Sequence, residues 1–200
     1  MNQPFYKIFD NIFPSALTNT IEEVVFNSLS YQGIDLSPNW KVNSNLSNSN
    51  SKDMGLNYLV WDKNNYSYDN TFFYLNPLYY FTNKLNLIIT QIIMTRMYLQ
   101  FPSNQANAEI HTDNNIENKG KIMPDPNVGI LLYYVNDSEG DTILYKNDRK
   151  TEVLKVTPKK GRCVFFSNLI PHKAGIPKKS PRAVINYNFK YCNPQLDKKN

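Results

Sequence analysis

Hydrophobic positions along the chain follow two different patterns that meet near residue 92. Before that point, after a strand-like segment "FYKIFDNIFP", apolar residues recur at helical spacing in two stretches. The first stretch could be capped by Ser15 and runs to about residue 29, with one apolar face made of Leu17, Ile21, Val24, Val25 and Leu29. The second enters at Pro77 and places on one face Leu78, Phe81, Leu85 and Ile88. This spacing predicts two helices in the N-terminal half.

After residue 92 the apolar residues come in short runs rich in β-branched and aromatic side chains. The runs are separated by Asn, Asp, Gly and Pro, and they read "IIMTRMYLQF", "NVGILLYYVND", "DTILYKN", "TEVLKVTP", "GRCVFFSN" and "RAVINYNFKY". Such runs predict strands joined by hairpin-like connections. The whole pattern predicts a mostly β fold, a sheet sandwich or jelly roll with helices packed on one side.

Two polar stretches interrupt these elements and predict loops. One covers residues 42–55, "VNSNLSNSNSKDMG", and the other covers residues 114–127, "NNIENKGKIMPDPN". The second follows the candidate metal residues described below, so it could act as a lid over a site or serve as a plain surface connection. The sequence does not separate these two roles.

Length, charge and cysteine content narrow the class of protein. Two hundred residues are expected to form one domain, 1–200. The net charge of +5 lies mainly in "KNDRKTEVLKVTPKKGR" and "HKAGIPKKSPR", but no aromatic residues alternate with these cations as a nucleic-acid platform requires. Two cysteines make neither a disulfide framework nor a zinc pattern. With no secretory signal and no long apolar run in the sequence, a cytoplasmic protein without a membrane segment is expected.

Both histidines of the chain lie where they could share one metal ion. His111 and Asp113 are two residues apart, so in an extended segment both side chains point to the same face. His172 follows an apolar strand after enough intervening strands to wind around a barrel and return. Two imidazoles and one carboxylate form the facial triad of non-haem ferrous sites. The alternatives at this point are a zinc site with the same ligands and a His–Asp hydrogen bond at a strand end.

An arginine after the second histidine suggests what else the site binds. Arg182 opens the strand "RAVINYNF", and its guanidinium could hold the far carboxylate of a dicarboxylic cosubstrate. Val184 and Asn186 share its strand face and would look into the same cavity. The alternative reading makes Arg182 a further surface cation beside Lys178 and Lys179.

In this order and spacing the motifs resemble the Fe(II)- and 2-oxoglutarate-dependent oxygenases, and among them the prolyl-4-hydroxylase-like branch with its small phage and bacterial members. "HTDNN" is similar to the family's first metal strand, and "LLYYVNDSEGDTILYKN" to its Tyr-Tyr-Leu-Asn strand and the following turn. "GRCVFFSNLIPHKAG" and "RAVINYNF" resemble the strands that carry the second histidine and the arginine. The resemblance covers residues 93–191, a jelly-roll core, and treats residues 1–92 as mainly helical support and loops.

The resemblance implies a double-stranded β-helix that uses Fe(II), 2-oxoglutarate and O2, with ascorbate as a stimulant. Iron would be held by the ligand set His111, Asp113 and His172. The far carboxylate of 2-oxoglutarate would bind Arg182 and accept a hydrogen bond from Tyr134, with Asn186 nearby. A further contact is expected from "TRMYLQFP", at Phe101 with Tyr98 beside it.

The resemblance also implies an activity, the hydroxylation of an aliphatic C–H with release of succinate and CO2. A peptidyl proline is the first expected substrate, and a free amino acid or other small molecule is the alternative; a non-catalytic or zinc-binding jelly roll is a further one. Halogenating members lack the aspartate that Asp113 provides here. The last strand departs from the Arg-x-Asn-x-Thr-x-Arg pattern of base-demethylating members, so nucleic acid is not the expected substrate. If the gene is carried by a phage, the expected location is the host cytoplasm.

Overall fold

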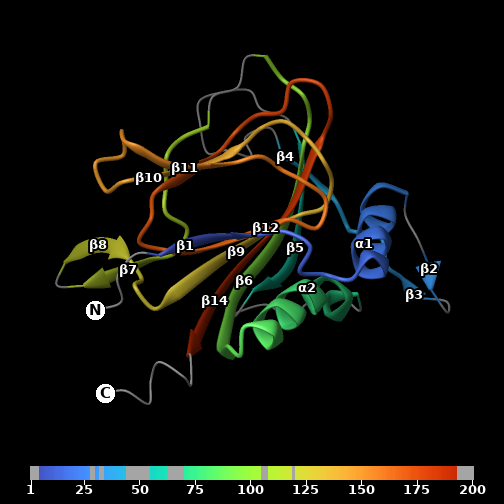
Figure 1. Ribbon diagram of the computed structural model, residues 1–200, viewed down its shortest axis with the longest axis horizontal. Helices are drawn as coiled ribbons and strands as arrows, with labels where there is room; N and C mark the ends of the chain where they lie inside the picture. Colours follow the sequence, from blue (N-terminus) through green and yellow to red (C-terminus); the bar gives the residue numbers. More distant parts are fainter. Residues whose placement is uncertain are drawn as a thin grey trace.

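The computed structural model describes residues 5–27, 30–31, 34–43, 55–62, 70–104, 108–118 and 120–192, and a seven-stranded antiparallel sheet runs through its centre (Figure 1). In spatial order the strands are β1 (Tyr6–Phe9), β12 (Cys163–Ser167), β9 (Val128–Tyr134), β14 (Arg182–Cys192), β6 (Ile88–Gln100), β5 (Gly55–Asp62) and β4 (Lys41–Asn43). A three-stranded sheet covers part of one face and consists of β11 (Glu152–Val156), β10 (Thr142–Tyr145) and β13 (His172–Ala174). Two short pairs complete the strands, β2 (Ser30–Tyr31) with β3 (Ile34–Asp35), and β7 (Asn115–Asn118) with β8 (Lys121–Pro124).

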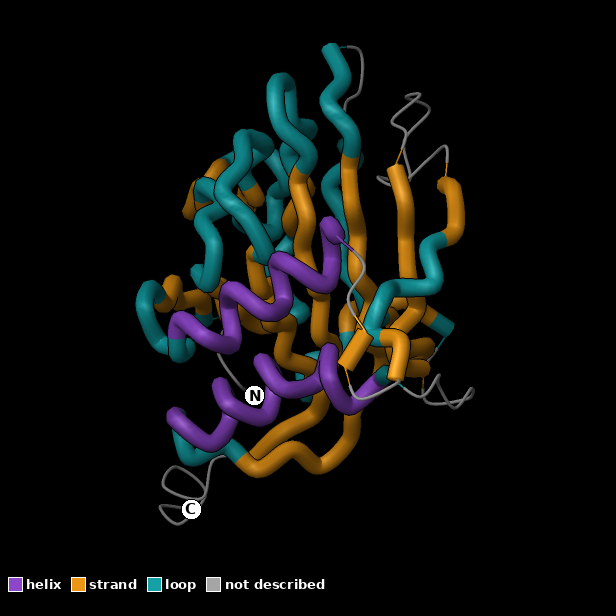
Figure 2. Tube along the Cα trace, turned by 90° about the vertical axis from the view of Figure 1, so that its right-hand side faces the viewer, coloured by secondary structure: helices purple, strands orange, loops and turns teal. Residues whose placement is uncertain are grey.

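The two helices lie together on the other face of the large sheet (Figure 2). They are α1 (Ser15–Asn27) and α2 (Thr71–Lys84). Helices on one face and a second sheet on the other give a mostly β fold with helical support, so the predicted fold class is confirmed. No helix in the described parts of the chain has the length and apolarity needed to cross a membrane.

Alternation along the central strands divides the interior into two layers. In β9, Leu131 and Tyr133 belong to the core under the helices, whereas Leu132 and Tyr134 belong to the core between the two sheets. This is the period-two geometry of a strand that is buried on both faces.

Strand β14 has the same alternation but carries polar residues on its inner side. Ile185 and Tyr187 pack under the helices, while Arg182 and Asn186 line a cavity on the side of the small sheet. Polar side chains inside a sandwich need partners, because burial without a hydrogen bond is costly. The strand face that should fill a hydrophobic core is therefore built to hold something polar.

The first predicted helix is confirmed, and the second is wrong at both ends. Helix α1 begins at Ser15 with Ile21, Val24 and Val25 buried as expected; Leu29 lies outside the described residues.

Helix α2 contains Pro77 instead of starting there, and it ends at Lys84. Asn86 has φ 52°, and the Leu87 amide donates to the Thr82 carbonyl, which closes the helix with a left-handed residue. Ile88 therefore starts β6 with 53% of its surface exposed and does not extend the helical stripe.

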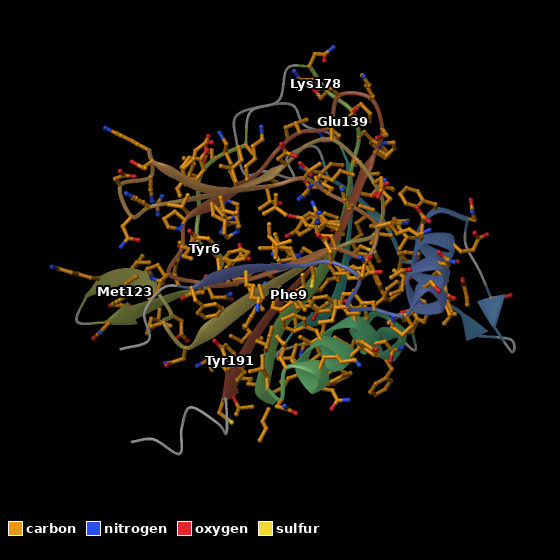
Figure 3. All side chains as sticks on the ribbon, in the orientation of Figure 1. Tyr6, Phe9, Met123, Glu139, Lys178 and Tyr191 are labelled. Carbon is orange, nitrogen blue, oxygen red and sulfur yellow. The ribbon has the colours of Figure 1, made fainter. Side chains whose placement is uncertain are left out.

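The predicted strands of the C-terminal half are all present, but the N-terminal half contains more strand than expected. Strand β1 confirms the strand predicted in "FYKIFDNIFP", whereas β4 and β5 of the large sheet are additional. Most of the loop predicted at residues 42–55 lies outside the described residues. The stretch 114–127 is not an irregular loop, because β7 and β8 pair in it as a hairpin whose Met123 lies on the side of the molecule away from α1 (Figure 3).

Candidate metal and cosubstrate site

The structure brings the two histidines and the aspartate of the predicted triad together. His111 and His172 face each other across a two-residue bridge in which each backbone N–H donates to the other carbonyl at 2.9 Å. Asp113 Oδ1 lies 3.4 Å from His111 Nε2 and 3.5 Å from His172 Nε2. One ligand atom from each of the three residues lies within 4.8 Å of the others. A single cation could bind all three.

Hydrogen bonds behind the histidines leave the correct nitrogen free for a metal. His111 Nδ1 lies 3.0 Å from the carbonyl oxygen of Glu109, and His172 Nδ1 lies 3.3 Å from that of Ile170. A carbonyl only accepts, so each Nδ1 carries a proton, and Nε2 is the ring nitrogen that is directed at Asp113 and can bind a metal. Metal-bound histidines are held in this way by backbone carbonyls. The donor set of two imidazole nitrogens and one carboxylate oxygen fits Fe(II), and it also fits Zn(II).

The Asp113 carboxylate stays ionised although it is buried. Burial raises its pKa, but the adjacent His172 and His111 outweigh that effect and hold the pKa of Asp113 well below its usual range. For His111, burial lowers the pKa, and the hydrogen bond and charge of Asp113 reverse this, so that the pKa is raised overall. The carboxylate of Asp113 and the two imidazoles therefore meet at the point where a metal would bind.

A relay of asparagine side chains holds the other oxygen of Asp113. Asn186 Nδ2 donates to Asp113 Oδ2 at 2.8 Å, Asn188 Nδ2 donates to Asn186 Oδ1 at 3.3 Å, and Asn114 Nδ2 donates to Asn188 Oδ1 at 3.0 Å. The buried Asn168 Oδ1 accepts the backbone N–H groups of Asp113 and Asn114. Asn186 and Asn188 each donate through Nδ2 and accept through Oδ1, so the orientation of these two amides is fixed. Oδ2 is thus occupied, and Oδ1 alone faces the histidines as a single ligand atom.

Replacing Asn186 with alanine is expected to weaken metal binding by about 10- to 100-fold, the usual cost of losing an outer partner of a metal ligand. The Asp113 carboxylate would then be free to rotate away from the histidines. Competition of Zn(II) or Fe(II) with a chromogenic chelator measures the change, and Asn147→Ala, an exposed asparagine, is the control. Unchanged affinity in Asn186→Ala would mean that the backbone contacts from Asn168 are enough to hold the carboxylate.

At the other end of the same cavity, Arg182 is buried without a counter-ion. Only 2% of the surface of Arg182 is exposed. Nη1 donates to Gln100 Oε1 at 2.8 Å and Nη2 to Thr142 Oγ1 at 2.9 Å, but Nε has no hydrogen-bond partner. Within the described part of the chain no carboxylate lies at ion-pair distance from it. An unpaired buried cation is costly, so the arrangement calls for an anion from outside the protein.

Thr142 supplies a second contact for such an anion. Its Oγ1 accepts a hydrogen bond from Tyr134 Oη at 2.7 Å in addition to the one from Arg182. A hydroxyl has two lone pairs and one hydrogen, so both lone pairs are used and the hydrogen remains to be donated. A carboxylate beside Arg182 would accept it. Tyr134 is not among the residues that line the cavity, and its hydroxyl lies behind Thr142, so the contact expected between Tyr134 and 2-oxoglutarate stays a prediction.

The metal residues and Arg182 share one cavity of about 310 Å³ between the two sheets. Its walls come from β6 and β14 of the large sheet and from β10 and β13 of the small one. The other residues expected near 2-oxoglutarate are spread over the cavity and its rim, and their contacts with 2-oxoglutarate stay predictions. Asn186 contacts Asp113 at the metal end, Tyr98 lines the cavity, and Phe101 lies outside it with 38% of its surface exposed.

Comparison with known proteins bears on the site and the fold. Residues 95–190 match the sequence model described as the 2OG-Fe(II) oxygenase superfamily. A 2OG-Fe(II) oxygenase family oxidoreductase from Burkholderia pseudomallei is similar in structure, with 9% identity, coverage of 94% of this chain and 85% of that one, and a TM-score of 0.63.

Two prolyl hydroxylases also share the fold. The Trichoplax adhaerens enzyme, solved with a hypoxia inducible factor peptide, has 16% identity, 92% and 83% coverage and a TM-score of 0.55. The Pseudomonas putida prolyl-4-hydroxylase has 13% identity, 92% and 91% coverage and a TM-score of 0.53. A search of curated proteins gave no match.

Proposed function

Because residues 95–190 place this chain in the 2OG-Fe(II) oxygenase superfamily, with Fe(II) and 2-oxoglutarate as its cofactors, we propose that it hydroxylates an aliphatic C–H bond of its substrate. In this reaction 2-oxoglutarate loses CO2 and becomes succinate. One oxygen atom of O2 enters succinate, and the other enters the substrate C–H to give an alcohol. The observation that carries the proposal is the presence, in one cavity, of a His–Asp–His cluster and a buried arginine without a counter-ion.

Each role that this reaction requires has a residue of this chain that fits it. His111, Asp113 and His172 would hold the iron through Nε2, Oδ1 and Nε2. Arg182 and Thr142 would bind the far carboxylate of 2-oxoglutarate, which orients its other end toward the metal. Iron supplies the chemistry of O2 activation when it is bound.

The likeness to prolyl hydroxylases makes a proline ring the first substrate to test. The Trichoplax enzyme was solved with a peptide fragment, and the Pseudomonas enzyme is named as a prolyl-4-hydroxylase. The low identities limit this support to the fold. A proline within a peptide and proline as a free acid are therefore both candidates.

The proposed function is tested by measuring succinate formed from 2-oxoglutarate by the purified protein with Fe(II), O2 and ascorbate. Iron-dependent formation of succinate is expected even without a primary substrate, because these oxygenases can turn over uncoupled. Zn(II) in place of Fe(II) should give none, since zinc does not change oxidation state. A protein that binds Zn(II) tightly and forms no succinate with Fe(II) under any condition would instead be a zinc protein or a non-catalytic jelly roll.

A further inference from the structure

A second arginine lines the cavity at the end that holds the metal residues. Arg96 belongs to β6 and is half-buried. Its Nη1 donates to Tyr98 Oη at 3.4 Å, a long and weak hydrogen bond. Nowhere in the described ranges does a carboxylate come within ion-pair distance of Arg96. The neutral Tyr98 hydroxyl contacts the guanidinium but does not neutralise it.

Strand pairing separates the two arginines along the cavity wall. In the register of β6 and β14, Gln100 lies opposite Arg182, and Arg96 lies opposite Asn186. Four residues of strand separate the two positions, about 13 Å along the sheet at the rise of an antiparallel strand. Since Asn186 contacts Asp113, Arg96 lies beside the metal residues, where a substrate C–H must approach.

The charges in the cavity do not balance without an additional anion. The charged side chains that line it, apart from the histidines, are Arg96, Arg182 and Asp113. The two histidines are neutral when their Nε2 atoms bind a metal. Fe(II) then adds two positive charges and 2-oxoglutarate two negative ones, which leaves one positive charge in a partly desolvated space. Arg182 is matched by the far carboxylate of 2-oxoglutarate, so Arg96 is the cation left over.

We propose that Arg96 binds a carboxylate of the primary substrate, and that this substrate is a small organic acid. The inference rests on the proposed function and specifies its substrate. A guanidinium binds a carboxylate through two parallel hydrogen bonds, whereas the carbonyl of a proline within a polypeptide is a neutral amide. A cavity of about 310 Å³ is at the small end of the range for ligand sites, which also suits a compact acid next to 2-oxoglutarate. Burial raises the pKa of the Tyr98 phenol, so Tyr98 stays neutral and contacts Arg96 without competing for the anion.

Binding to the inactive Zn(II)- and 2-oxoglutarate-loaded protein tests this inference without turnover. The probes are the proteinogenic L-amino acids, their N-acetyl derivatives and small dicarboxylic acids, each beside its primary amide, together with a proline-rich peptide. Calorimetry is expected to show at least one acid that binds about tenfold or more tightly than its amide, the least that a charge-assisted pair contributes. Arg96→Gln should remove this preference. Lys178→Gln, which deletes a surface cation outside the cavity lining (Figure 3), should retain it.

Three results would overturn the assignment. They are equal binding of acids and amides, binding of the peptide alone, and no binding of any acid in the panel. Arg96→Gln also decides between substrate and cosubstrate, because a loss confined to 2-oxoglutarate affinity would place Arg96 on 2-oxoglutarate. Failure of the proposed function looks different, since it appears as absent iron-dependent succinate formation in the assay without any of these probes.

Discussion

Replacing Asp113 with alanine is expected to abolish iron-dependent succinate formation while the protein stays folded. Among the residues that the structure describes, Asp113 alone places a carboxylate oxygen between the two histidines, at 3.4 and 3.5 Å from their Nε2 atoms. Two neutral imidazoles alone hold a divalent ion poorly. Loss of a residue that only supports a metal ligand costs up to about 100-fold in metal affinity, and loss of the ligand Asp113 should cost more. Chelator competition measures the affinity, and succinate release measures the turnover.

Two variants separate the loss of a ligand from general damage at this site. Asp113→Asn keeps the size and an oxygen that can accept the Asn186 hydrogen bond, but it removes the charge, so it should also lose the metal. Glu109→Gln neutralises an exposed acid that lies two residues before His111 and is not part of the cluster, so its metal affinity should match the wild type. Thermal unfolding of all three should show a cooperative transition. An active Asp113→Ala protein would remove Asp113 from the ligand set.

The metal cluster could be predicted from the sequence because two of its residues are close in the chain and because the chain has only two histidines. His111 and Asp113 are two residues apart, and extended chain alone places such side chains on one face. His172 was then the only other histidine in the chain. The return of His172 to the same place needed the strand series between them, which the short apolar runs predicted.

The groups that support the cluster could not be predicted in the same way. The asparagine relay joins Asn114, Asn186 and Asn188 to Asp113, and two of these residues come from a strand far along the chain. Asparagine is abundant in this sequence, so no single one stands out. Thr142 likewise looks like an ordinary strand residue until Tyr134 and Arg182 are both seen to donate to its hydroxyl. Partner relations across strands are set by register, which a sequence read alone does not contain.

The errors in secondary structure also have a physical origin. The apolar residues of helix α2 continue at helical spacing through Leu85 to Ile88, so periodicity extends the helix too far. Asn86 stops it by adopting a left-handed conformation that asparagine tolerates better than most residues. At the start, the preference of proline for the first helical turn predicts that the helix begins at Pro77, but Pro77 lies inside the helix and is buried. At the C-terminal end, the conformation of Asn86 therefore outweighs the hydrophobic periodicity. At the N-terminal end, Pro77 gives a false signal for the start of the helix.

Replacing Arg182 with methionine is expected to raise the KM for 2-oxoglutarate by about 30-fold or more, the cost of truncating one partner of a buried charge pair. Metal affinity should change little, because Arg182 lies four residues along β14 from Asn186, the residue that contacts Asp113. Without 2-oxoglutarate the variant should be no less stable than the wild type, since a buried cation with an unpaired Nε is itself unfavourable. This combination, weaker cosubstrate binding without lost stability, distinguishes a binding residue from a structural one.

Thermal unfolding with and without 2-oxoglutarate provides a readout of Arg182 that does not depend on turnover. A ligand that binds only the folded state raises the unfolding temperature, so 2-oxoglutarate should stabilise the Zn(II)-loaded wild type and not Arg182→Met. Arg182→Lys keeps the charge but cannot reach Gln100 and Thr142 together. Its KM for 2-oxoglutarate should lie between the values of the wild type and of Arg182→Met. The matched control is Arg162, which does not line the cavity and whose Nε lies 2.6 Å from Asp10 Oδ1. Arg162→Met should leave the KM for 2-oxoglutarate unchanged. If Arg182→Met kept the wild-type KM, the buried guanidinium would have to be neutralised by something other than 2-oxoglutarate, and the cosubstrate would have to bind elsewhere in the cavity.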